Sequence, residues 1–251
     1  MSAQPYALDL EIARRGGRTF LSRRYFRWPY EIGILTHGQV RGLSDDTASL
    51  IVQSATSGLI TGERLRQRVV VRDGGRVRLV GQGAMPVQKV GSHEGAAEDL
   101  SLKVMGGSRL DFVSEPRLLL PGSSFSQVSR VSVDTSSCVL LVDAVVRHPD
   151  AGSVSYLSET TLEFDGEVAA VERMGFHCVG EHHFGASAFI LAVGDHVTGL
   201  DWKWWLNKHG ARTSYGAVSP LRSCPGMSIR VVAENGYHLR RAIDDALSIL
   251  V

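Results

Sequence analysis

Short runs of alternating apolar and polar residues recur along most of the chain, with turn residues between them. Residues 99–104 are the clearest case, because Leu100, Leu102 and Val104 fall on one face and polar residues fall on the other. A period of two is typical of a half-buried β-strand. The longer run 138–146 is apolar enough to predict a strand that is buried on both faces. The pattern therefore predicts a mainly β protein.

Glycine-containing turns separate these runs and predict β-hairpins. The strongest signal is Asp-Gly-Gly at residues 73–75, between two alternating valine-rich runs. Glycine accepts the positive φ that a tight hairpin turn requires. Two further hairpins are predicted about residues 14–17 and about Asp165-Gly166.

The C-terminal segment has a different period. Asn235 is a suitable N-cap for a helix. The apolar residues after it recur at helical spacing, namely Leu239, Ala242, Ile243, Ala246, Leu247 and Leu250. Because no linker or low-complexity tract divides the chain, we predict a single domain over residues 1–251 with a C-terminal helix.

Composition narrows the class of protein. Of 251 residues, 43% are hydrophobic and 21% are charged, which is typical of a globular protein. The formal net charge is +1, which argues against a protein dedicated to binding nucleic acids or anionic membranes. The three cysteines form no CxxC pair. The N-terminus lacks the continuous apolar core of a signal peptide, and no apolar run reaches the roughly 20 residues that cross a bilayer. We expect a cytoplasmic protein.

Candidate chemistry is sparse. The run Gly-Gln-Gly-Ala-Met-Pro at residues 81–86 lacks the third glycine and the helix of a dinucleotide site, and no GxSxG or HExxH motif is present. The densest group of possible metal ligands contains His177, His182 and His183, close to Cys178 and Glu181. Its spacing matches no closed zinc motif, so a solvated loop is favoured over a weak metal site. The sequence does not indicate an enzyme.

Two aromatic clusters allow two interpretations each. Residues 23–29 (RRYFRWP) suggest either a stacking platform for single-stranded nucleic acid or, preferably, a strand edge with core-facing aromatics and solvated arginines. Trp202, Trp204 and Trp205 suggest either a buried corner or a protein-contact anchor. If exposed, these tryptophans would favour an alternative function, a carbohydrate- or ligand-binding β module.

Three blocks of the sequence resemble the urease accessory protein family UreD, also called UreH. Residues 54–63 resemble its SPGGGLVGGD segment, residues 79–87 resemble its TTQAATKV stretch, and residues 110–123 resemble its LEWLPQPTILFPGS block. Residues 147–152 depart from the family's GRxxxGE segment, so the chain is identified as a divergent member.

The resemblance implies an elongated, helical (β-helix-like) arrangement of strands. It also implies a non-enzymatic scaffold or metallochaperone that binds UreF, and UreG through UreF, on apo-urease. Nickel(II) would be a transient cargo that travels through an internal polar passage, with no permanently bound cofactor.

Carried over to this chain, the passage acids would be Glu63, Asp143 and Glu172. Gln82 and the three tryptophans would line the passage or contact a partner. Exchangeable oxygen ligands suit a moving Ni²⁺ better than thiolates. The alternative is that Asp143 and Glu172 only hold strands together by pairing with arginines such as Arg147 and Arg173.

Overall fold

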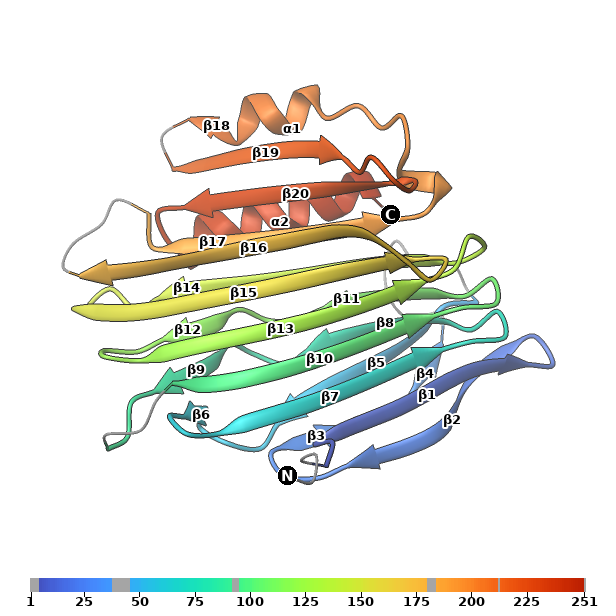
Figure 1. The fold of residues 1–251 in the computed structure, drawn as a ribbon, viewed down its shortest axis with the longest axis horizontal. Helices are drawn as coiled ribbons and strands as arrows, with labels where there is room; N and C mark the ends of the chain where they lie inside the picture. Colours follow the sequence, from blue (N-terminus) through green and yellow to red (C-terminus); the bar gives the residue numbers. More distant parts are fainter. Residues whose placement is uncertain (1–4, 38–45, 92–94, 180–183, 212, 251) are drawn as a thin grey trace.

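Two β-sheets lie face to face in the computed structural model (Figure 1), which describes residues 5–37, 46–91, 95–179, 184–211 and 213–250. We call them the first and second sheets. The first sheet has seven strands in the order β16 (Glu167–Val179), β15 (Ser153–Phe164), β13 (Ser124–Val133), β10 (Ala96–Val104), β7 (Arg64–Val71), β1 (Leu8–Arg15) and β2 (Arg18–Phe26).

The second sheet has thirteen strands. Its main path is β18 (Gly210–Ala211), β19 (Ser214–Pro220), β20 (Gly226–Ala233), β17 (Ala186–Val193), β14 (Cys138–Arg147), β11 (Arg109–Val113), β8 (Arg76–Gly81), β5 (Ala48–Ser54) and β3 (Tyr30–Ile32). Four short strands join beside this path, namely β4 (Thr36–His37), β6 (Leu59–Ile60), β9 (Met85–Gln88) and β12 (Arg117–Leu119). The helical elements are η1 (Asp195–Val197), α1 (Lys203–Lys208) and α2 (Gly236–Leu250).

The central part of the chain winds as a coil. Strand β7 of the first sheet is followed by β8 and β9 of the second, and β10 is followed in the same way by β11 and β12. Strands β7, β10, β13 and β15 are parallel neighbours, as are β8, β11 and β14. Successive coils therefore stack (Figure 1), and the mainly β, β-helix-like fold with a C-terminal helix is confirmed.

The predicted hairpin at residues 73–75 is wrong, although both strands and the turn exist. Strands β7 and β8 belong to different sheets, so the turn carries the chain across the sandwich. Asp73 and Gly74 do adopt positive φ, at 58° and 72°. The other two predicted hairpins are confirmed, because β1 pairs with β2 and β15 pairs with β16 in antiparallel register.

The core has two parts. One lies between the sheets and is built from inward residues such as Leu10, Val69, Leu102 and Leu141. The other lies on the opposite face of the second sheet, where the apolar side of α2 packs on β17 and β20. Strand β14 contributes to both parts, which confirms the prediction of a strand buried on both faces.

Asn235 caps α2 as predicted, because its Oδ1 accepts a hydrogen bond from the backbone N of His238 at 3.1 Å. Five of the six apolar positions are buried, namely Leu239, Ala242, Ile243, Ala246 and Leu250. No helix in the described part of the chain is long and apolar enough to cross a membrane. All three cysteines are free thiols.

The basic-aromatic cluster at residues 23–29 departs from the preferred interpretation. Strand β2 is an edge of the first sheet, but its aromatics do not enter the core, since Tyr25 is 44% exposed and Trp28, just beyond the strand, is 67% exposed. The arginines are held in part by neighbouring groups, as when Arg23 pairs with Asp9 at 2.9 Å. Strand β2 is the last strand of its sheet, and most residues on both of its faces are exposed, so the opposite sheet leaves this edge largely uncovered.

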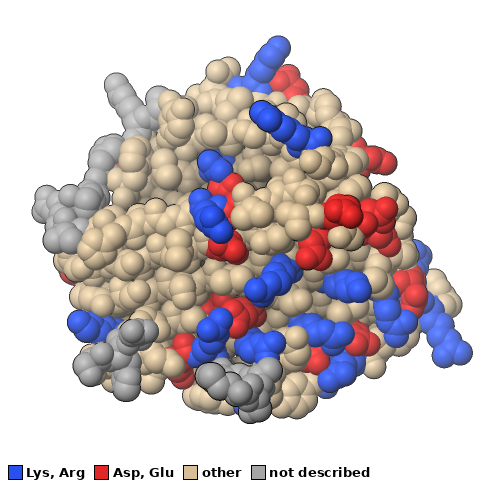
Figure 2. Space-filling model, viewed as in Figure 1, with Lys and Arg blue, Asp and Glu red and all other residues tan. Residues whose placement is uncertain are grey.

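Figure 2 shows basic and acidic side chains interspersed on the face of the molecule seen in Figure 1. Ion pairs join neighbouring strands of the first sheet, for example Arg64 with Asp99 at 2.8 Å and Arg173 with Glu159 at 2.7 Å. Each such exposed pair contributes little to stability. Their mixed signs agree with the near-zero net charge.

A column of turns at one end of the coils is held by backbone hydrogen bonds. Gly74 N donates to Gly106 O at 2.8 Å, and Gly106 N donates to Asp134 Oδ2 at 2.6 Å. Asp134 also accepts from the backbone N and the hydroxyl of Ser136, at 3.0 and 2.8 Å. Burial by itself would raise the pKa of Asp134, but these hydrogen bonds outweigh it and lower the pKa.

Asp134→Ala is expected to lower the free energy of unfolding at pH 7 by about 1 kcal/mol, because it removes charge-assisted hydrogen bonds at a partly exposed turn. The folded-state pKa lies below the unfolded value of about 3.9, so this contribution is present above that value and is lost as the pH falls through the folded-state pKa. Urea unfolding of both proteins at pH 7 and at several values below pH 4 measures it. Equal stability at pH 7 would contradict the assignment.

Candidate functional site

Two rows of polar side chains cross the inner face of the first sheet from strand to strand. One row consists of register neighbours on β10, β13 and β15, namely Glu98, Gln127 and Ser158. The second row lies beside it on β7, β13, β15 and β16, and contains Gln67, Ser129, Thr160 and Glu172. All of them except Glu172 are at most 7% exposed. Polar groups in an apolar interior are costly unless they are hydrogen-bonded, so packing alone does not account for these rows.

The Glu98 end of the rows is an ion-paired cluster. Arg117 donates to Glu98 Oε2 from Nε at 2.8 Å and from Nη2 at 2.5 Å. On the other oxygen, Tyr30 Oη donates to Glu98 Oε1 at 2.8 Å, and Gln67 Nε2 reaches Tyr30 Oη at 2.9 Å. Burial, and then the Glu98 charge, raise the pKa of Tyr30 well above its usual value, so the phenol keeps its proton and acts as a donor.

Asp143 lies farther along the rows and extends inward from β14 of the second sheet. Its Oδ2 accepts hydrogen bonds from Ser158 Oγ at 2.8 Å and from Tyr156 Oη at 3.0 Å. Burial raises the pKa of Asp143, and the hydrogen bonds together with the charge of Arg117 offset this only in part. Asp143 is 2% exposed, so a carboxyl group with no direct ion pair to Arg117 sits inside the sandwich.

Glu172 forms the far end of the second row. It pairs with Arg230 of β20, and its side chain is 16% exposed. Beside it, Thr160 Oγ1 is buried without a hydrogen-bond partner among the described residues. Both side chains line a cavity of about 40 Å³ with Phe189 and Ser228, which has room for water that would satisfy the hydroxyl.

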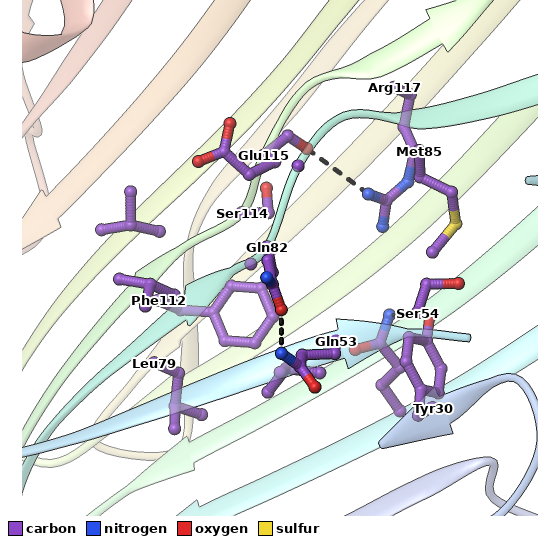
Figure 3. Close-up of a pocket in the computed structure, with 16 residues that line it drawn as sticks. Tyr30, Gln53, Ser54, Leu79, Gln82, Met85, Phe112, Ser114, Glu115 and Arg117 are labelled. Carbon is purple, nitrogen blue, oxygen red and sulfur yellow. Dashed lines mark hydrogen bonds between the residues drawn. The ribbon is translucent and has the colours of Figure 1, made fainter. Parts of the chain in front are cut away.

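A pocket opens at the Glu98 end, between β3, β5, β8 and the segment before β12 (Figure 3). Its cavity volume is about 50 Å³. In Figure 3, Gln82 and Gln53 are hydrogen-bonded to each other, Tyr30 lies near Ser54, and Arg117 points toward the backbone oxygen of Glu115.

A second, smaller void of about 10 Å³ lies directly inside this pocket and fits about one water molecule. Its lining includes Glu98, Gln127 and Leu141. Four side chains line both spaces and therefore separate them, namely Gln67, Phe112, Ser114 and Arg117. The pocket, the void and the polar rows lie in sequence along the sandwich.

The predicted passage acids are only partly brought together. Asp143 and Glu172 belong to the inner polar arrangement. Glu63 does not, because it lies in the turn between β6 and β7, where its Oε2 accepts a hydrogen bond from Ile60 N at 2.9 Å. Gln82 is exposed and lines the outer pocket.

The alternative role, in which Asp143 and Glu172 hold strands together by pairing with arginines, describes Glu172, but its partner is Arg230 of β20 and not Arg173. Arg173 pairs with Glu159 on the outer face, whereas Glu172 pairs with Arg230. Residues adjacent in a strand point to opposite faces, so Glu172 and Arg173 do not meet. Asp143 is held by hydroxyl groups, as described above.

The three tryptophans lie away from the polar rows. Trp202 and Trp205 are buried in the core beneath α2, and Trp205 Nε1 donates to Ala242 O at 3.0 Å. Trp204 is 53% exposed, with Lys208 over its ring. Two of the three rings are therefore unavailable as a binding platform, so the ligand-binding module loses the feature that favoured it.

Of the suspected metal ligands, Glu181, His182 and His183 lie outside the described residues. His177 is exposed on β16, and Cys178 is on the opposite face of the same strand. No group of three or more His, Cys, Asp or Glu side chains in the described part of the chain has the geometry to hold a metal ion.

Sequence reasoning missed Glu98, Arg117, Gln67 and Tyr30. The period of two contained a signal for the first, because Glu98 shares its face with Leu100 and Leu102, which form the apolar face of the predicted strand. Arg117 gave no such signal, since it sits on a three-residue strand next to a proline.

Comparison with known proteins identifies the family. The family model described as UreD urease accessory protein matches residues 4–251. A relative named urease accessory protein UreD, from Mycolicibacterium smegmatis, is 33% identical over 244 residues, which are 95% of this chain and 88% of the relative.

Two relatives named urease accessory protein UreD 2 come from Bradyrhizobium strains. One is 37% identical over 150 residues, which are 59% of this chain and 51% of the relative. The other is 28% identical over 257 residues, which are 97% and 88% of the two chains. Because the family model spans nearly the whole chain and the Mycolicibacterium relative aligns over most of both proteins, this protein belongs to the UreD family of urease accessory proteins, with a role in urease maturation.

Proposed function

We propose that this protein is a scaffold and metallochaperone that passes nickel(II) to apo-urease along the polar rows between its sheets. In this role it binds UreF, and UreG through UreF, and catalyses no reaction of its own. Membership of a family of accessory proteins supports a maturation factor over a catalyst. Nickel is the cargo and is bound only in transit.

The observation that carries the proposal is the arrangement of oxygen donors between the sheets. Three carboxylates, Glu98, Asp143 and Glu172, follow one another along the strand order β10, β15 and β16, where Asp143 is placed by its bond to Ser158. Hydroxyl and amide groups of the two rows lie between them. Carboxylate, carbonyl and water oxygens are weaker ligands for Ni²⁺ than imidazole or thiolate, so they are suited to passing the ion on and not to retaining it.

Space for water beside these groups supports a wet route. Thr160 Oγ1 lacks a partner among the described residues beside a cavity, and the void near Glu98 fits about one water. Buried carboxylates are tolerated where water or a cation compensates them.

The partner interaction is tested by co-expression. Tagged full-length protein is expected to capture UreF, and to capture UreG only when UreF is present. Capture of UreG without UreF, or no capture of UreF, would contradict the scaffold role.

Glu172→Ala is expected to lower urease activation by about three- to tenfold when nickel is limiting, because it removes a carboxylate ligand at the far end of the rows. Capture of UreF should be unchanged. Urease activity of cells that co-express the urease genes is the measurement.

Glu159→Ala is the matched control, since Glu159 lies on neighbouring β15 but faces solvent and pairs with Arg173. Its activation should equal that of the wild type. Equal activation by the Glu172 and Glu159 variants would remove Glu172 from the route.

A further inference from the structure

The ion pair between Arg117 and Glu98 stands where the outer pocket meets the inner void. Arg117 lines both spaces, and Glu98 lines the inner one. Their side chains are 12% and 1% exposed. Arg117 is therefore one of the side chains that separate the pocket from the void, and its partner Glu98 lies on the inner side.

The carboxylate of Glu98 has both oxygens engaged. Oε2 accepts two hydrogen bonds from the guanidinium of Arg117, at 2.8 and 2.5 Å. Oε1 accepts from Tyr30 Oη at 2.8 Å and lies 3.3 Å from Gln67 Nε2. The guanidinium is also a fixed positive charge that repels a metal cation at this point.

We propose that Arg117 acts as a gate that occupies Glu98 as an internal counter-cation, and that its withdrawal converts Glu98 into a divalent-cation site. This inference rests on the proposed passage of nickel between the sheets and specifies how that passage is closed in the isolated protein. A buried carboxylate that loses its cation takes up either a proton or another cation. The void next to Glu98 has room for a species of about the size of one water, so a divalent cation can lie against the freed carboxylate.

The segment that carries Arg117 is connected to the surface. Arg117 Nη1 lies 3.4 Å from the backbone oxygen of Glu115, and the side chain of Glu115 pairs with Arg240 of α2 at 3.0 Å. Arg240 is half exposed and also pairs with Asp244. A protein that binds this end of α2 would thus act on the segment of the gate, which gives a physical route for opening it on complex formation.

A second buried ion pair provides a matched comparison. Arg78 and Asp111 are 13% and 1% exposed, almost the same as Arg117 and Glu98, and lie 3.0 Å apart. Neither residue lines the pocket or the void, and Arg109 remains on Asp111 at 2.9 Å if Arg78 is lost. The two ion pairs are therefore equally buried, but only the pair of Arg117 and Glu98 borders the pocket and the void.

The experiment is calorimetric titration of NiCl₂ into purified full-length protein with four sequences: wild type, Arg117→Gln, Arg117→Gln with Glu98→Gln, and Arg78→Gln. Arg117→Gln should bind one Ni²⁺ more than the wild type does. At this site the affinity of the variant should be at least about tenfold higher, since an opposing charge is removed. The double variant and Arg78→Gln should lack this site. The difference between the single and double variants cancels any nickel bound at surface histidines.

No additional Ni²⁺ in Arg117→Gln, or an additional site that persists without the Glu98 carboxylate, would overturn the proposal. If Arg117→Gln does not stay folded, Arg117→Met replaces it, because it also removes the positive charge and keeps an unbranched side chain. That variant should bind Ni²⁺ more tightly than the wild type, and equal affinity would overturn the gate. The titration uses metal alone, so its failure leaves the urease-activation test of Glu172 unaffected.

Discussion

Asp143→Asn is expected to lower nickel-limited urease activation by about ten- to 100-fold, which is the largest functional effect predicted for a single substitution in this protein. Asp143 lies between Glu98 and Glu172 in strand order and carries the carboxylate nearest Ser158 and Tyr156. Asparagine keeps an oxygen to accept those two hydrogen bonds but removes the negative charge. The fall in urease activation therefore reports the loss of a negative charge in the middle of the route and not a change in packing.

The measurement is urease activity after co-expression with limiting and with excess nickel, together with capture of UreF. Capture should match the wild type at both nickel levels, and excess nickel should restore part of the activity. Asp99→Asn, on the outer face of β10, is the control and should activate normally. Normal activation by Asp143→Asn with nickel limiting would remove Asp143 from the route, and lost capture would instead indicate a structural role.

Glu98→Ala is expected to lower the free energy of unfolding by about 3–5 kcal/mol, the largest predicted effect on stability, because it leaves the guanidinium of Arg117 buried without its partner. Tyr30 and Gln67 also lose an acceptor. Urea unfolding at pH 7, followed by circular dichroism, measures the change.

Asp99→Ala is the neighbouring control, since Asp99 pairs with Arg64 on the exposed face and should cost at most about 1 kcal/mol. Replacing both Glu98 and Arg117 by leucine should recover most of the stability, because two well-packed apolar side chains can replace a buried ion pair. A double variant as unstable as Glu98→Ala would show that the cost comes from packing and not from the unpaired charge.

Family resemblance supplied part of the site that periodicity could not. Asp143 was carried over from the family, and it lies in a strand so apolar that the alternation rule indicates no functional face. Glu63 was carried over in the same way, yet it serves a turn outside the polar rows. A motif match transfers the residue type, whereas the surroundings of that residue depend on segments far away in the chain.

The alternation of the sequence also places one residue of the site, Glu98, on the inner face of its strand. Side chains two residues apart in a strand share a face, so extending the alternation of residues 99–104 back by one residue places Glu98 on the inner face with Leu100. What the strand does not contain is the partner, because Arg117 reaches Glu98 from the other sheet. The sequence therefore indicates a charged residue at an inward position, but it does not indicate the arginine that neutralises the charge.

Local sequence determined the strands, the turns and the capped C-terminal helix, because alternation, positive-φ turn residues and an N-cap act over a few residues. Tertiary structure decided which strands pair. Asp73 and Asp165 both precede a glycine and have φ of 58° and 52°, yet the first turn crosses between sheets and the second closes a hairpin. Backbone geometry at the two turns is alike, so the pairing depends on which neighbouring strands are available. Strand β8 pairs with β5 and β11, whereas β16 pairs with β15. The polar rows exist only in that register, since their members come from five strands, of which only β15 and β16 are joined by a hairpin that the sequence predicts.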